Sequence, residues 1–275
     1  MRLERLPAGS LITLTLIIFA LLVILPLGQL LTYASEEDLG LFIDRFSTPE
    51  AWAALRLTVE IGLAATAVNL VTGTAVAIVL VKSNLRFKSV LDAMVDIPLA
   101  IPTVVIGFAL LLLYGPNGWL GRYLNPVGLE VLFSFSGILL AHVFVTFPFM
   151  VRAVGTAMEG LDPNYEKAAR TLGANSWQTF FYVTLPCIKK GIIAGSVLTF
   201  SKSVGEFGAT LMVSGNLIGK TQTGPLYIFS RFNTGDIEGA SAIALVLAVF
   251  SFIILLILRY VTADKKEAAA GEQAY

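Results

Sequence analysis

Six long apolar segments constrain most strongly what this chain can fold into. They run over residues 10–32, 57–81, 94–114, 133–151, 191–213 and 240–261. A helix needs about 20 apolar residues to cross the hydrocarbon core of a bilayer, and each segment is about that long. The composition agrees, since 14% of the residues are charged, whereas soluble domains carry about 25%. The sequence therefore predicts an all-α integral membrane protein, a single domain over residues 1–275 with six transmembrane helices.

The basic residues predict how these helices are oriented. Most of the lysines and arginines lie before the first segment, between the second and third, between the fourth and fifth, and after the sixth. Loops rich in Lys and Arg stay in the cytoplasm. Both termini are therefore expected to be cytoplasmic, in a multi-pass protein of a prokaryotic inner membrane. The long connection between the fourth and fifth helices, residues 162–186, is expected on the same side.

Composition and motifs exclude several other classes of protein. The net charge is zero, so nothing indicates nucleic-acid binding. One cysteine excludes a cysteine-based metal cluster, and a single histidine argues against a zinc site. The stretch "SGNLIGKTQTGP", residues 214–225, approaches a phosphate-binding loop, but three residues rather than four separate Gly215 from Gly219. The predicted topology places this segment outside the cell, so we expect an outer turn there and no cofactor on this chain.

The connection over residues 162–186 predicts two short helices. Asp162, followed by proline, is typical of a helix start, and Gly173 can end that helix in a left-handed conformation. Ser176 can cap a second helix, and Pro186 is expected to interrupt it before the next membrane helix. From the residues alone, this pair either lies on the membrane surface or forms a docking site for a partner.

The stretch "KAARTLGANSWQTFFYVTLP" resembles the signature loop of ABC importer permeases, which reads E-A-A, three residues, G, nine residues, I-x-L-P. In this chain Lys167 stands at the glutamate position, with Glu166 just before it, and Val183 replaces the isoleucine. The resemblance implies a coupling helix that inserts into a separate ATPase subunit, where ATP and Mg bind. The residues it assigns to ATPase coupling are Glu166, Lys167, Ala168, Ala169, Gly173, Leu185 and Pro186.

Polar residues interrupt the fifth apolar segment. Lys202 is expected about 18 Å from Lys190 along a helix, near the bilayer centre, and Glu206 follows four residues later on the same face. Two interpretations are open, a Lys–Glu pair that locks helices together or a path for anions. In the third segment, the two prolines predict kinks or carbonyl groups freed to face a pore. The candidate pore or gate residues are Thr199, Lys202, Ser203, Gly205, Glu206, Pro98 and Pro102.

The sequence predicts structural rather than functional roles for three further titratable residues. Asp92 and Asp96 are expected only to favour the N-terminus of the third helix. His142, within the fourth segment, is interpreted as a hydrogen-bonded packing residue rather than a proton relay.

Three stretches narrow the resemblance to the sulfate and molybdate permease branch over nearly the whole chain. They are "DIPLAIPTVVIG", "GEFGA" and "GNLIGKTQTGPLYIF". The branch implies one permease subunit of a binding-protein-dependent importer for a tetrahedral oxyanion, either sulfate or thiosulfate or else molybdate or tungstate. Its implied partners are ABC ATPase subunits, an identical or homologous second permease, an extracytoplasmic substrate-binding protein and the lipid membrane.

The alternative is a secondary anion transporter driven by an ion gradient, with the pair Lys202–Glu206 as its coupling site. Such transporters commonly contain inverted repeats, and no repeat is evident here. An intramembrane enzyme would need a metal or nucleophile constellation, which the sequence lacks.

Overall fold

The computed structural model describes residues 8–35, 43, 47–83 and 86–263, and within them every regular element is helical. In chain order these are α1 (Ala8–Phe19), η1 (Ala20–Ile24), α2 (Leu25–Ser35), α4 (Pro49–Lys82), α5 (Lys88–Ala100), α6 (Thr103–Tyr114), α7 (Gly121–Leu124), η2 (Asn125–Val127), α8 (Phe135–Glu159), α9 (Pro163–Thr171), α10 (Ser176–Thr179), η3 (Phe180–Thr184), α11 (Leu185–Val204), α12 (Gly208–Ser214), α13 (Gly224–Asn233) and α14 (Ile237–Ala263). Five helices are long and apolar enough to cross a membrane, or six if the bent pair α5–α6 is one span. The all-helical membrane fold is therefore confirmed. The chain termini, whose cytoplasmic placement was predicted, lie outside the described residues.

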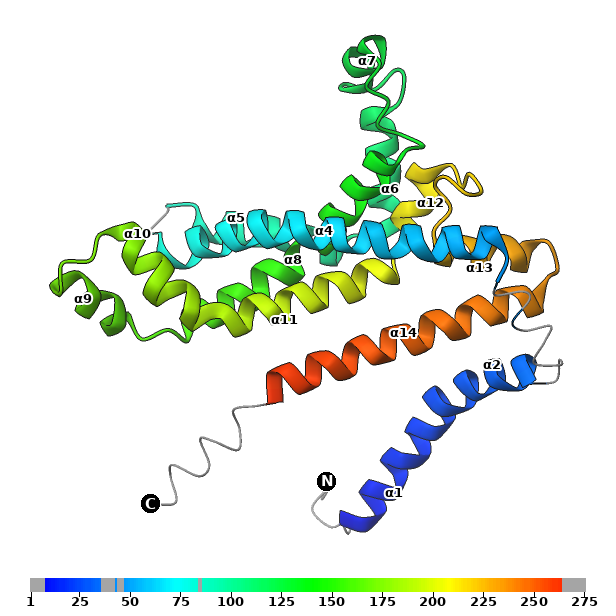
Figure 1. The fold of residues 1–275 in the computed structure, drawn as a ribbon, viewed down its shortest axis with the longest axis horizontal. Coiled ribbons are helices and arrows are strands. Elements are labelled where there is room, and N and C mark those ends of the chain that lie inside the picture. The colour runs from blue at the N-terminus through cyan, green and yellow to red at the C-terminus, as the bar shows by residue number, and fades with distance from the viewer. Residues whose placement is uncertain (1–7, 36–42, 44–46, 84–85, 264–275) are drawn as a thin grey trace, which may run out of the picture.

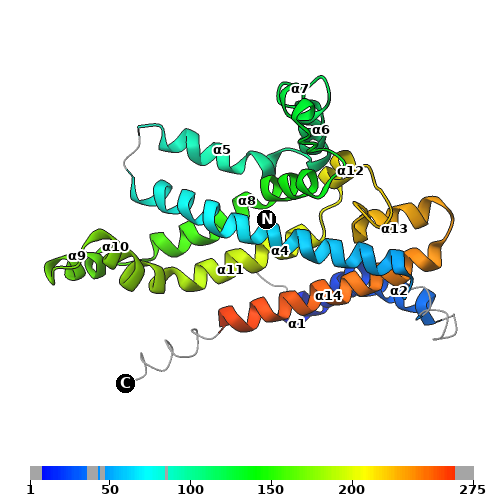
Figure 2. The ribbon, with the colours of Figure 1, turned by 45° about the horizontal axis from the view of Figure 1, so that its top comes forward.

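Helices α4, α8 and α11 lie side by side and form the central bundle (Figures 1 and 2). Glycines let these helices approach closely. A Cβ atom on Gly73 would lie 2.8 Å from Met150, and one on Gly191 would lie 2.3 Å from the Cβ of Ala157. Small residues at such contacts are how helices pack in lipid, where no hydrophobic force drives them together. α9 and α10 lie at one end of the bundle, and α13 lies at the other.

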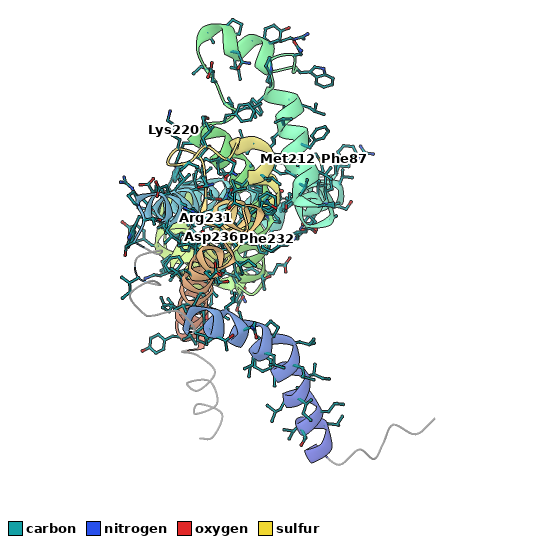
Figure 3. All side chains as sticks on the ribbon, turned by 90° about the vertical axis from the view of Figure 1, so that its right-hand side faces the viewer. Phe87, Met212, Lys220, Arg231, Phe232 and Asp236 are labelled. Carbon is teal, nitrogen blue, oxygen red and sulfur yellow. The ribbon has the colours of Figure 1, made fainter. Side chains whose placement is uncertain are left out.

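Two arms leave this bundle in opposite directions, as the end-on view of Figure 3 shows. One arm is α6 with α7 at its tip, and the other is α1 with α2. The kink that the prolines predict in the segment 94–114 is present, and it is a sharp break in which α5 and α6 meet at 104°. The break falls at Ile101, which is extended (φ −96°, ψ 134°), immediately before Pro102. Proline disfavours helical geometry in the residue that precedes it, whereas Pro98 lies inside α5 without ending it.

The expected helix over 191–213 is also divided. α11 ends at Val204, and α12 begins at Gly208 after a short break. The Glu206 carboxylate accepts a hydrogen bond from the Ala209 amide (3.1 Å), which satisfies one of the free N–H groups at the start of α12. α12 then packs against α6, so the two broken helices stabilise each other.

This α6–α12 contact gives a testable expectation. Gly107→Ala would place a Cβ atom 2.6 Å from the Ala209 carbonyl oxygen, a backbone atom that cannot rotate away. We expect a loss of about 1–3 kcal/mol in stability. Gly155→Ala in α8 is the matched control, because a Cβ atom there meets nothing within 4 Å. The thermal unfolding midpoints of the two purified variants are measured in detergent, and the midpoint of Gly107→Ala should be the lower one. Equal midpoints would contradict the close contact.

Two leucine–proline pairs are accommodated by π turns. The Leu185 amide donates to the carbonyl oxygen of Phe180, and the Leu25 amide donates to that of Ala20, five residues back in each case. The wider turn precedes a proline that lacks an N–H group. Pro186 therefore does not interrupt the helix, contrary to the prediction, and one continuous helix runs from Ser176 to Val204.

Candidate functional site

The signature loop folds as its local sequence predicts, apart from the uninterrupted helix at Pro186 and the cap of the second helix. The Asp162 side chain caps α9 by accepting from the Asn164 amide (2.9 Å), and Gly173 ends the helix at φ +89°. The Ala174 amide closes this end on the Ala169 carbonyl (3.0 Å). The second helix, however, is capped by Asn175 rather than Ser176, because Asn175 and Gln178 form a reciprocal capping box.

Glu166 holds α9 against the bundle. Its carboxylate lies 2.5 Å from the Lys82 ammonium at the end of α4, and it accepts a hydrogen bond from the Thr184 hydroxyl in η3. Partial burial raises the pKa of Glu166, but the hydrogen bonds from Lys82 and Thr184 outweigh it, and the net pKa lies below the ordinary value. Glu166 therefore joins three elements and points into the protein, not outward.

The other loop residues named from the sequence divide between two environments. Lys167, Ala168, Gly173 and Pro186 are exposed, whereas Ala169 and Leu185 are half-buried. Large apolar side chains stand exposed beside them, with Leu172 88%, Trp177 73% and Tyr182 80% accessible. Trp177 stacks on Phe181 with ring centroids 5.9 Å apart. The turn between α9 and α10 thus carries an uncovered apolar surface at the end of the bundle.

The Glu166 contacts predict a pH dependence confined to this loop. A carboxylate whose pKa is lowered on folding stabilises the folded state above its ordinary pKa of 4.5 and loses that contribution as the pH falls below it. We expect the protection factors of the α9 amides, which are their intrinsic exchange rates divided by the observed rates, to fall as the pH falls below 4.5. Glu166→Gln should remove this fall in protection, while Asp162→Asn, which keeps a cap, should retain it. The same pH response in wild type and Glu166→Gln would contradict the expectation.

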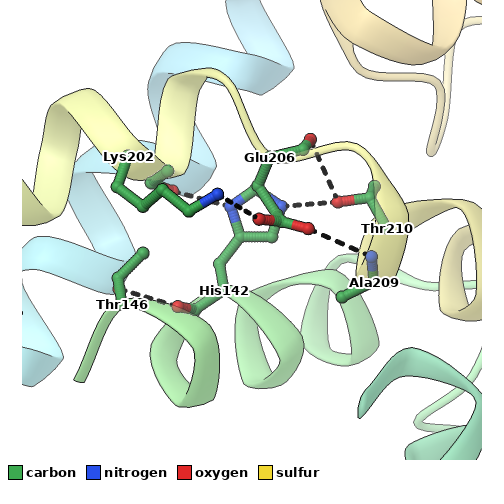
Figure 4. A network of polar contacts seen from close by, with 7 residues as sticks. His142, Thr146, Lys202, Glu206, Ala209 and Thr210 are labelled. Carbon is green, nitrogen blue, oxygen red and sulfur yellow. Dashed lines mark hydrogen bonds and ion pairs between the residues drawn. The ribbon is translucent and has the colours of Figure 1, made fainter. Parts of the chain in front are cut away.

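A buried polar network fills the junction of α8, α11 and α12 (Figure 4). His142 contacts Ser203 through Nδ1 (2.6 Å) and Thr210 through Nε2 (2.8 Å). Asn69 on α4 donates to the Thr146 hydroxyl (2.9 Å), which donates to the His142 carbonyl (2.7 Å). His142 is therefore a hydrogen-bonded packing residue, as the sequence indicated.

The pair Lys202–Glu206 bridges the break between α11 and α12. The ammonium lies 3.0 Å from a Glu206 oxygen, and Figure 4 shows the carboxylate between Lys202 and Ala209. Glu206 is 1% exposed, whereas 38% of the Lys202 side chain is accessible. One end of the pair is therefore fixed inside the bundle, and the other end faces outward from this single chain.

The remaining pore candidates are not gathered at one surface. Thr199 is fully buried, and its hydroxyl has no hydrogen-bond partner among the described residues. Ser203 is buried against His142, and Pro98 is buried in α5. Gly205 and Pro102 are exposed, each at a break between helices. The structure thus brings Lys202, Ser203, Gly205 and Glu206 together, and Pro102 directly precedes Thr103, which lies against Gly208 at the start of α12.

Arg152 is the functional candidate that sequence reasoning missed. Its guanidinium binds both Asp96 oxygens (2.9 and 2.6 Å) and one Asp92 oxygen (2.7 Å), and so ties α8 to α5. Asp92 and Asp96 are the fifth and ninth residues of α5, so the role at a helix N-terminus expected for them is wrong. An arginine inside an apolar helix and two carboxylates spaced i, i+4 were the available signals.

The outer-turn segment around Gly215 forms a compact polar turn at the opposite end from α9. Thr221 donates to the Ser214 carbonyl (2.6 Å), and Asn216 donates to Ser230 (2.7 Å). Lys220 is exposed in this turn (Figure 3). No helix begins directly after Lys220, as a phosphate-binding loop requires. Among the described residues, no group of three His, Cys, Asp or Glu could hold a metal ion.

Comparisons with known proteins agree with this geometry. The family described as "Binding-protein-dependent transport system inner membrane component" matches residues 69–266. The chain is 36% identical to the sulfate transport system permease protein CysW of Synechococcus elongatus, over 96% of this chain and 91% of that protein. It is 36% identical to the sulfate transport system permease protein CysT of Escherichia coli, over 88% and 87% of the two chains.

A solved structure shares the fold at low sequence identity. It is a crystal structure of a bacterial alginate ABC transporter in complex with an alginate pentasaccharide-bound periplasmic protein. The TM-score is 0.76 at 18% identity, over 92% of both chains. The chain therefore belongs to the binding-protein-dependent inner membrane components, the permeases of ABC importers, in the branch that includes the sulfate permeases CysT and CysW.

Proposed function

We propose that this permease carries sulfate across the membrane, driven by a separate ATPase. The observation that carries the proposal is that the similarity to sulfate permeases extends over nearly the whole chain, including α4, α8 and α11. Thiosulfate, molybdate and tungstate have the same tetrahedral shape and are the alternative cargoes. The chain itself breaks no bond and binds no nucleotide.

In this proposal the ATPase docks on the turn between α9 and α10. The exposed Leu172, Trp177 and Tyr182 offer apolar area of the kind that anchors protein interfaces. Glu166 ties the docked helix to α4 and η3, so movement of α9 is passed to the membrane helices. The end with α9 and α10 is then cytoplasmic, and the turn around Lys220 faces the extracytoplasmic binding protein.

The permease acts as one half of the pathway. A lysine that is 38% exposed within a membrane helix is costly if it faces lipid. A second permease, identical or homologous, would place Lys202 at a shared, water-filled path instead. The Lys202 ammonium would then attract the anion, while Glu206, buried behind it, keeps the lysine in place.

The test is to purify the complex, count its distinct membrane subunits, and reconstitute it with the ATPase and binding protein in liposomes. We expect ATP-dependent uptake of radiolabelled sulfate. Competition with thiosulfate, molybdate and tungstate identifies the preferred cargo. Uptake that persists without ATP but collapses with the proton gradient would overturn the proposal in favour of a secondary transporter.

A further inference from the structure

Helix α5 is weakly packed against the rest of the protein. Of its residues, Val95 and Pro98 are the buried ones. A crevice of about 810 Å³ separates α5 from α4 and α6, lined by apolar side chains that include Leu91, Val76 and Leu113. A second, smaller groove lies between Leu99 on α5, Phe149 on α8 and Leu198 on α11. In Figure 2 α5 stands apart from α4.

One polar contact compensates for this weak packing. Arg152 makes a two-pronged contact with Asp96 and further hydrogen bonds to the Asp92 side chain and the Asp92 carbonyl (3.0 Å). A planar guanidinium that binds carboxylates at both prongs fixes orientation as well as distance. The contact therefore sets where α5 lies relative to α8.

The far end of α5 is a natural hinge. Ile101 and Pro102 are outside both helices, and α6 leaves at 104°. α6 is held separately, by its close packing on α12. If the Arg152 contact opened, α5 could rotate about Ile101 into the adjacent crevice without unpacking α6.

We propose that Arg152 is a positioning residue of the transport cycle, a latch that holds α5 against α8 and releases it when the ATPase drives the permease. The inference rests on the proposed function, since it assumes an ATP-driven cycle. Arg152 acts on α5 and is not assigned to the anion path. Its role is to keep α5 fixed on α8 until the ATPase cycle releases it.

The experiment measures the position of α5 in the complete complex. Cys187 is first replaced by serine, and spin labels are placed at exposed Ser89 on α5 and Lys190 on α11. Labelled permease is diluted with unlabelled permease so that each complex carries one labelled chain. We expect the distance between labels to shift between the nucleotide-free and the ATP-trapped complex. An identical distance in the two states would overturn the latch.

Variants then test whether the ion pairs are responsible. Arg152→Gln should show the ATP-trapped distance without ATP and at least a tenfold rise in ATP hydrolysed per anion transported. Arg152→Asp combined with Asp96→Arg exchanges the two charges, leaves Asp92 in place, and should restore both values. A wild-type distance in Arg152→Gln, or failure of the exchange to restore it, would overturn the proposal.

The distances measured in the wild-type complex test the proposal independently of the variants and of the cargo. Even if Arg152→Gln does not assemble, an unchanged wild-type distance in the two nucleotide states overturns the proposal. The distances do not depend on which anion is carried. Wild-type complex that moves α5 with ATP but imports no sulfate would therefore contradict the proposed cargo and leave the latch standing.

Discussion

Gly173→Val is expected to abolish anion uptake. Gly173 ends α9 at φ +89°, a conformation that costs a residue with a Cβ atom about 1–2 kcal/mol and is especially poor for a β-branched side chain. The substituted turn should relax to negative φ, which redirects the chain between α9 and α10. Leu172 and Trp177, on either side of the turn, would then no longer present one surface to the ATPase. We expect uptake by reconstituted liposomes to fall at least tenfold, together with loss of the ATPase on co-purification.

Gly128→Val is the matched control for this experiment. Gly128 has nearly the same backbone (φ +79°), and a Cβ atom at either glycine meets nothing within 4 Å. It follows η2 on the α6–α7 arm, away from α9. The two variants therefore carry similar backbone strain at different places. Normal uptake and normal ATPase retention in Gly173→Val would contradict docking at this turn.

Glu206→Ala is expected to destabilise the protein more than any other single loss of charge discussed above. The change leaves the Lys202 ammonium without its carboxylate and the Ala209 amide without its cap. Because Glu206 is buried but 38% of the Lys202 side chain is accessible, the expected cost is about 1–3 kcal/mol, mainly from the Ala209 amide left without its partner. We expect a clear fall in the thermal unfolding midpoint in detergent and loss of uptake.

Glu60→Ala tests the same kind of pair in an exposed setting. Arg56 and Glu60 are also an i, i+4 ion pair, 2.7 Å apart, but their side chains are 78% and 44% exposed. Exposed pairs of this kind contribute little to stability, so the unfolding midpoint should not change measurably. Equal effects in Glu60→Ala and Glu206→Ala would show that burial of Glu206 is not what matters.

The parts of the fold that depend on nearby residues were predictable from the sequence. The cap at Asp162 and the left-handed turn at Gly173 follow from local backbone preferences, and both are present. The length of the apolar segments gave the all-helical membrane class. The hydrogen-bonded environment of His142 followed from the need of a buried imidazole for partners.

The parts that depend on distant residues were not predictable in this way. Lys82 and Glu166 are 84 positions apart, and Arg152 is 56 positions from Asp96. Nothing in the local sequence says that Glu166 turns inward while Lys167 stays exposed. The size of the bend at Ile101 was not predictable for a related reason. A proline in an apolar segment predicts a kink, but its angle is set by what α6 packs against.

The π turn before Pro186 also sets the angle, around the helix axis, between the residues that precede it and those that follow it. Successive residues of an α-helix are about 100° apart around its axis, so the extra residue of a π turn offsets everything on one side from everything on the other. Because Ser176–Val204 is a single helix, the angle around its axis between the Trp177 and Lys202 side chains is fixed. Removing one residue within Phe180–Thr184 would keep the sequence around Trp177 and around Lys202 and would turn one segment against the other by about a quarter of a revolution.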